Sequence, residues 1–62
     1  MIEVIRNANL EPIGFREITD SREVLLDKEG QEVGVYDKAT KVTRDRHGRT
    51  VGLYINQLLR LL

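Results

Sequence analysis

The chain has 62 residues, of which 40% are hydrophobic and 32% are charged, and its formal net charge at pH 7 is zero. This length predicts a single domain over residues 1–62, and the composition is that of a globular rather than a disordered protein. There is no cysteine, which excludes disulfides and thiolate metal sites, and no apolar run reaches the roughly 18 residues of a membrane span.

Strand-like residues occur in six short segments that are separated by turn residues. β-Branched and aromatic residues in partial alternation favour strands. The predicted strands are, in chain order, 2–6, 12–18, 23–27, 32–37, 40–45 and 50–55. Asn7, Ala8 and Asn9 form a loop, and Pro12 confines its strand to a start or an edge position. We therefore predict a mainly β fold: a small antiparallel meander of five to six short strands.

Two of the predicted hairpins repeat one pattern. DKEGQEVGVYD at residues 27–37 and DRHGRTVGLYI at residues 45–55 share D-x-x-G-x-x-V-G-x-Y. The Asp can accept hydrogen bonds from backbone N–H groups within the turn, and the first Gly can take the left-handed conformation that ends it. A fainter third copy lies at Ile13-Gly14-Phe15. The repeat therefore indicates a sheet built from similar β-hairpins.

Each repeat is expected to place small and aromatic residues on one face of the sheet and aliphatic residues on the other. In the first copy Gly34 and Tyr36 alternate with Val33 and Val35. The second copy alternates in the same way, with Gly52 and Tyr54 against Val51, Leu53 and Ile55. Because an aromatic ring can lie across the bare backbone of a glycine, we expect aromatic rings to cover these glycines.

The C-terminal segment INQLLRLL is strongly apolar. Ile55, Leu58, Leu59 and Leu62 have helical spacing and Asn56 could cap the N-terminus, although a segment this short could also pair as a strand. We expect some leucines to cover the sheet of their own chain and the rest to contact another subunit. The candidate interaction residues are Leu58, Leu59, Leu61 and Leu62, together with the unpaired edges of the sheet.

Charge is distributed unevenly along the chain. Residues 1–37 hold nine acids and four bases, whereas residues 38–62 hold six bases and one acid. This asymmetry can mark an anion-binding face, or attraction between the two halves within one chain or between copies. Five bases of one predicted hairpin could contact the phosphates of a nucleic acid: Lys38, Lys41, Arg44, Arg46 and Arg49.

Residues that could carry catalysis are sparse. His47 is the only histidine and stands in a turn, and the only serine, Ser21, is distant in sequence. A divalent metal could be held by Asp27, Glu29, Asp45 and His47 only if two turn tips lie side by side. The sequence contains no phosphate-binding glycine loop, and the spacing of its carboxylates singles out no pair for general acid–base catalysis. We predict no enzymatic activity, no cofactor and no metal site.

A domain this small buries only about 60% of the surface that its unfolded chain exposes, so partner subunits are a common source of support. The first ten residues do not resemble a signal peptide, and we expect a cytoplasmic protein without membrane contact. The favoured function is a small non-enzymatic protein-interaction module that self-associates through its sheet edge and C-terminal leucines, or binds another protein. The alternative is a nucleic-acid-binding protein that uses the basic 38–49 hairpin.

Overall fold

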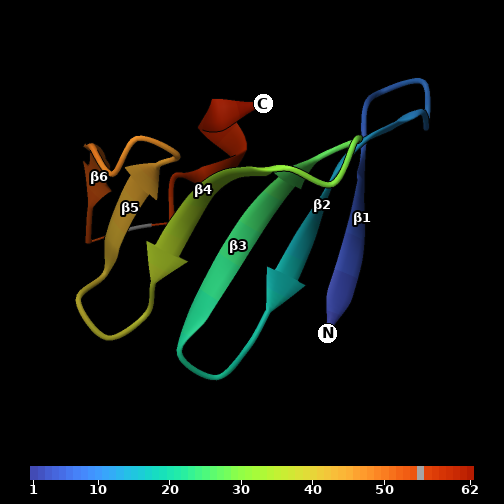
Figure 1. Ribbon diagram of the computed structural model, residues 1–62. Coiled ribbons are helices and arrows are strands. Elements are labelled where there is room, and N and C mark those ends of the chain that lie inside the picture. The colour runs from blue at the N-terminus through green and yellow to red at the C-terminus, as the bar shows by residue number, and fades with distance from the viewer. Residues whose placement is uncertain (55) are drawn as a thin grey trace.

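The computed structural model describes residues 1–54 and 56–62, so Ile55, predicted to end the last strand, lies outside the described residues. The described strands are β1 (Ile2–Arg6), β2 (Pro12–Ile18), β3 (Arg22–Asp27), β4 (Glu32–Asp37), β5 (Val42–Asp45) and β6 (Thr50–Leu53), followed by the 3-10 turn η1 (Leu58–Leu61). The strands pair in chain order, each antiparallel to the next (Figure 1). The predicted mainly β meander is confirmed, with β1 and β6 as its edges.

The turns after β3 and β5 have the geometry that their Asp-x-x-Gly sequences predict. The Oδ1 atom of Asp27 accepts hydrogen bonds from the backbone N–H groups two and four residues ahead, both at 2.9 Å. Asp45 accepts the equivalent pair at 2.8 and 3.0 Å. Gly30 and Gly48 close the turns with φ angles of 86° and 81°. This left-handed conformation costs glycine least, so each turn is fixed by two residues.

The turn after β1 is a third copy of the same design. The Oδ1 atom of Asn7 accepts hydrogen bonds from the N–H groups of Asn9 at 2.9 Å and Glu11 at 3.1 Å. Leu10 holds the position that glycine has in the other two turns, and its φ is 63°. The sequence pattern hides this copy because Asn stands for Asp and Leu stands for Gly. The repeat therefore covers three whole hairpins.

Leu10→Gly is expected to raise the free energy of unfolding by about 1 kcal/mol. A non-glycine residue in the left-handed region costs about 1–2 kcal/mol, part of which the extra chain entropy of glycine offsets. Leu10 is 74% exposed, so little packing is lost. Urea denaturation measures the change. Gly30→Leu is the reciprocal control and should destabilise the protein; a Leu10→Gly variant that unfolds at lower urea contradicts the expectation.

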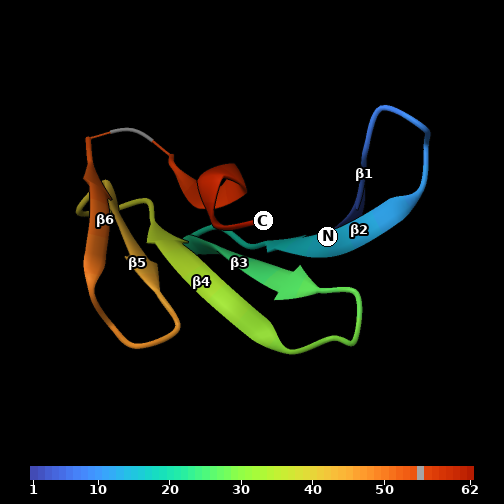
Figure 2. The same cartoon turned by 90° about the horizontal axis from the view of Figure 1, so that it is seen from above.

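Each of the three hairpins also carries a β-bulge next to a glycine. The register shifts at Ile5/Arg6, at Leu25/Leu26 and at Thr43/Arg44. Bulges bend a strand and increase its twist. The sheet curves, and η1 lies on the inner side of the curve (Figure 2). The residues left without a register partner are Ile13, Val33 and Val51, which precede Gly14, Gly34 and Gly52.

The sheet has two faces of different character. We call the face under η1 the covered face and the opposite face the open face. Directly paired residues of neighbouring strands share a face, so the register assigns them. The covered face carries Glu3, Ile5, Gly14, Arg16, Ile18, Glu23, Leu25, Asp27, Gly34, Tyr36, Thr43, Asp45 and Gly52. The open face carries Ile2, Val4, Arg6, Pro12, Phe15, Glu17, Arg22, Val24, Leu26, Glu32, Val35, Asp37, Val42, Arg44, Thr50 and Leu53.

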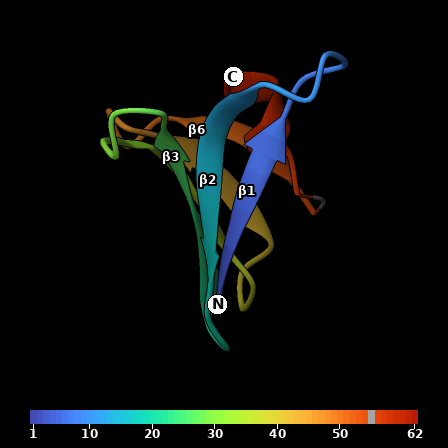
Figure 3. The same ribbon diagram turned by 90° about the vertical axis from the view of Figure 1, so that its right-hand side faces the viewer.

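The core lies between η1 and the covered face. Leu25 and Leu58 are fully buried, one from the sheet and one from η1. In Figure 3, seen from the β1 side, the edge strand stands in front and η1 lies behind it near the top. A core of so few fully buried side chains is consistent with the small size of the chain.

The glycines of the covered face support the C-terminal segment rather than aromatic rings. A Cβ atom added to Gly34 would meet the side chains of Leu58 and Leu61, and one added to Gly52 would meet Gln57. Tyr54 is 76% exposed. The expectation that aromatic rings cover the glycines is therefore wrong. The bare backbone instead lets the larger apolar C-terminal segment approach the sheet closely.

Candidate interaction surfaces

The four C-terminal leucines divide between the core and the surface. Leu58 is fully buried and Leu61 is half-buried above Gly34, whereas Leu59 and Leu62 are 55% and 45% exposed. The first pair is three residues apart, and residues three apart share a face in a 3-10 helix. Of the predicted interaction residues, Leu59 and Leu62 therefore keep most of the apolar surface.

Side-chain hydrogen bonds fix the segment that leads into η1. The Oδ1 atom of Asn56 accepts a hydrogen bond from the N–H of Leu58 at 3.0 Å, and its Nδ2 donates to Glu23 at 2.9 Å. The N–H of Gln57 donates to the hydroxyl of Thr43, a fully buried residue of β5, at 3.1 Å. Gln57 holds the N-cap position by backbone geometry, and Asn56 supplies the capping oxygen. The segment is thus a capped 3-10 turn rather than a strand.

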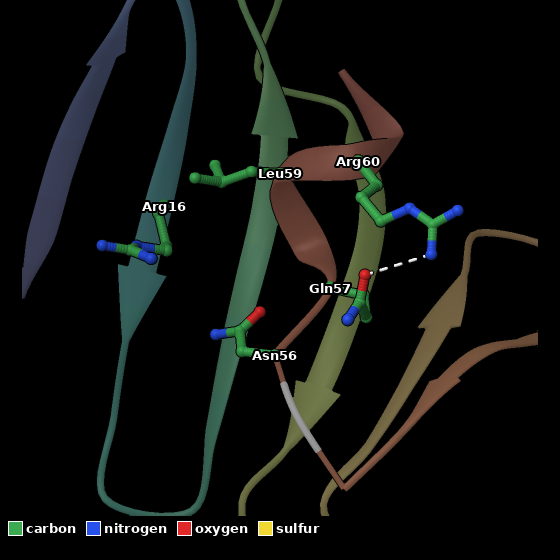
Figure 4. Close-up of a pocket in the computed structure, with 5 residues that line it drawn as sticks. All are labelled: Arg16, Asn56, Gln57, Leu59 and Arg60. Atoms are coloured by element: carbon green, nitrogen blue, oxygen red, sulfur yellow. Dashed lines mark hydrogen bonds between the residues drawn. The ribbon is translucent and has the colours of Figure 1, made fainter.

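A hollow of about 200 Å³ opens between β2 and the C-terminal segment (Figure 4). Arg16, Asn56, Gln57, Leu59 and Arg60 line it, and Nη1 of Arg60 donates to Oε1 of Gln57 at 3.1 Å. This hollow could not be predicted from the sequence, because it forms only when residues 56–60 fold back over the sheet beside Arg16.

The charge of Arg16 in this hollow is already compensated. Its Nη2 lies 2.7 Å from Oε1 of Glu3, and its Nη1 lies 3.4 Å from Oε1 of Glu23. The Nε atom of Arg16 is buried and has no hydrogen-bond partner. Two carboxylates beside one guanidinium leave little net positive charge, so the hollow is poorly suited to a strongly anionic ligand.

The described elements leave the open face of the sheet uncovered. Among those elements only η1 lies outside the sheet, and it packs on the covered face. Ile2, Val4 and Leu53 are 66%, 41% and 54% exposed at the margins, whereas Val24 in the middle is 9% exposed. The apolar side chains of this face come from all six strands: Ile2, Val4, Phe15, Val24, Leu26, Val35, Val42 and Leu53.

The two sheet edges differ in length. β1 has five residues, and the terminal amine of Met1 donates to the carbonyl of Ile18 at 2.9 Å, so its pairing with β2 extends to the chain start. β6 has four residues, and the N–H of Tyr54, just after it, donates a hydrogen bond to the carbonyl of Lys41 at 2.6 Å. β1 is therefore the longer edge for pairing with a further strand.

The five predicted nucleic-acid contacts do not form one patch. Lys38 and Lys41 lie in the turn between β4 and β5, whereas Arg46 and Arg49 lie in the turn at the other end of β5. β5 has four residues, which separates its ends by about 10 Å at a rise of about 3.3 Å per residue. Arg44 points to the open face between them.

Three of these five bases already make contacts within the chain. The Nζ atom of Lys38 donates to the carbonyl of Thr19 at 2.7 Å and so ties two turns together. The Nη1 atom of Arg44 donates to Thr50 Oγ1 at 3.2 Å, and Nε of Arg49 lies 3.1 Å from Oδ2 of Asp45. These three bases therefore stabilise their own chain, whether or not they also bind an anionic partner.

The two Asp-x-x-Gly turn tips do not assemble a metal site. Within residues 1–54 and 56–62, no three His, Asp or Glu side chains gather where they could hold a metal ion. Hydrogen bonds from the backbone N–H of Arg49, then from that of His47, together with the nearby Arg49 charge, lower the pKa of Asp45. Its carboxylate serves the turn, and His47 is exposed.

Comparison with known proteins finds no matching family model, no matching curated protein and no matching solved structure. In the part of the chain that the structure describes, no helix has the length and apolarity needed to cross a membrane. The geometry of the chain itself therefore has to support any functional proposal.

Proposed function

We propose that the protein is a small non-enzymatic protein-interaction module that self-associates. The open face carries this proposal, because it spreads apolar side chains over all six strands and leaves Ile2 and Leu53 more than half exposed. Large apolar side chains that stay exposed at both margins of one face make that face a candidate contact surface. A chain of 62 residues with two fully buried leucines also gains stability from a second subunit.

Two further surfaces, one at the sheet edge and one on the covered side, suit the same role. The edge of β1 can accept a strand from a partner, and Leu59 in η1 and Leu62 after it present apolar surface. Leu58 and Leu61 contribute indirectly, because they hold η1 against the sheet. Two of the possible metal ligands support a non-enzymatic role, since the carboxylates of Asp27 and Asp45 accept turn hydrogen bonds.

Light scattering over a range of protein concentrations tests self-association. We expect the mass to rise from that of one 7.2 kDa chain toward that of two chains as the concentration increases. Leu59→Asp changes an exposed residue and reports whether the C-terminal segment takes part. A mass that stays at one chain up to millimolar concentration overturns the proposal.

The alternative function is nucleic-acid binding by the basic 38–49 hairpin. Lys41 and Arg46 are exposed there, and positive side chains on a hairpin can neutralise phosphates. The light-scattering run with added duplex oligonucleotide separates the two proposals. A complex with the oligonucleotide that dissociates as salt is raised supports the alternative, and an unchanged mass at low salt excludes it.

A further inference from the structure

We propose that the open face is a dimer interface, on which a second copy stacks face to face. Its two-fold axis would run parallel to the strands, between β3 and β4. The inference rests on the proposed self-association and specifies its surface and geometry. The occupant is identified by the charges of the open face, because the proposed axis places four of its six charged strand residues opposite a charge of the other sign.

One row of directly paired residues crosses the open face from β1 to β5. In order it reads Ile2, Glu17, Val24, Val35 and Arg44. The two valines occupy the centre of the sheet. The carboxylate on β2 and the guanidinium on β5 stand at equal distances, in strands, from the line between β3 and β4. Both charged residues are exposed.

A two-fold rotation about that line turns the second sheet over and exchanges β2 with β5 and β3 with β4. Glu17 of one copy then faces Arg44 of the second copy, and the contact occurs twice because a two-fold interface is isologous. Val24 of one copy faces Val35 of the other. Oppositely charged groups across an interface fix its register and exclude other arrangements.

A second row of the open face obeys the same symmetry. Arg22 on β3 is paired with Asp37 on β4, and both belong to the open face. The same axis places Arg22 of one copy over Asp37 of the second copy. By contrast, an axis perpendicular to the strands places β2 over β2 and brings Glu17 toward its own equivalent. The charges therefore select the axis parallel to the strands.

The size and curvature of the face predict a weak dimer interface. The open face is the outer side of the curved sheet, so contact is confined to the strands nearest the axis, β2 to β5. Four strands about 4.8 Å apart, each contributing about 17 Å of length, give roughly 330 Å² per copy, so the dimer buries about 650 Å², which is the size of a weak interface. Sheets in sandwiches pack about 10 Å apart with strands inclined by about 30°. We therefore expect a dimer that dissociates on dilution.

Charge reversal tests the proposed geometry. Glu17→Arg alone places two pairs of like charges in the interface, and we expect the dimer dissociation constant to rise at least tenfold. Arg44→Glu alone should act similarly. The double variant Glu17→Arg/Arg44→Glu restores opposite charges, so its dissociation constant should return to within about threefold of the unmodified protein. Analytical ultracentrifugation measures all of them, and circular dichroism confirms the fold of each variant.

Glu29→Arg is the matched control, because it makes the same change of charge at an exposed turn outside the open face. It should leave dimerisation unchanged. If the unmodified protein dimerises but neither single reversal weakens the dimer, or the double variant fails to recover, the inference is overturned while self-association stands. If the unmodified protein does not dimerise at all, both proposals fall.

Discussion

Leu58→Ala is expected to lower the free energy of unfolding by about 3–5 kcal/mol. Leu58 is fully buried between η1 and the covered face, and it is one of only two fully buried leucines among the described residues. Truncating a buried Leu to Ala typically costs about 2–5 kcal/mol, and more where the cavity cannot collapse. Here the cavity left by Leu58 is bounded by the β4 backbone at Gly34, which limits its collapse.

The expected loss is large relative to the total free energy of unfolding of the domain. A domain of 62 residues has a stability of roughly 3–9 kcal/mol at the usual values per residue. Much of the variant should therefore be unfolded at 37 °C, as urea denaturation and thermal melts followed by circular dichroism would show. Leu59→Ala is the control, because Leu59 is 55% exposed and its loss should cost less than about 1 kcal/mol. Equal costs for the two variants would contradict the described orientation of η1.

The fold was predictable because its determinants are local. The Asp and Gly of residues 27–30 and 45–48 fix two hairpin turns by hydrogen bonds within four residues. The strand boundaries follow from those turns, and the structure confirms the meander. The first hairpin was harder to recognise, because Asn7 makes the same hydrogen bonds and Leu10 takes a glycine conformation without being glycine.

The surfaces were less predictable because they depend on contacts between distant segments. Alternation of Gly34 with valines indicates two unlike faces, but it does not indicate that residues 56–62 fill the glycine face. Ile55, Leu58, Leu59 and Leu62 have helical spacing in the sequence, which does not show which leucines are buried. A 3-10 turn aligns Leu58 with Leu61 and Leu59 with Leu62, and the contacts with Gly34 show that the first pair faces the sheet.

The basic hairpin illustrates the same limit for charged residues. Five bases within twelve residues look like one patch in the sequence, yet a four-residue strand separates Lys38 and Lys41 from Arg46 and Arg49. Only the register shows that Arg44 lies on the open face in line with Glu17.

Gly34→Ala is expected to lower the free energy of unfolding by about 2–3 kcal/mol. The added Cβ would lie 2.7 Å from the carbonyl oxygen of Arg44 and would also clash with the side chain of Leu61. The carbonyl belongs to the β5 backbone and cannot move without disturbing the pairing of β4 with β5. Overpacking of this kind typically costs about 1–3 kcal/mol. Urea denaturation measures the loss.

Gly52→Ala is a second test of the same face, because its Cβ would meet Cγ and Cβ of Gln57, at the near end of that side chain. The backbone N–H of Gln57 is bonded to Thr43, so we expect a loss of about 1–3 kcal/mol here as well. The double variant Gly34→Ala/Leu61→Ala should recover only part of the stability, since the clash with the carbonyl oxygen remains. If Gly34→Ala were as stable as the unmodified protein, the C-terminal segment would not lie on this face. The open face would then lose its assignment, because the same placement of η1 determines which side of the sheet is left for a second copy.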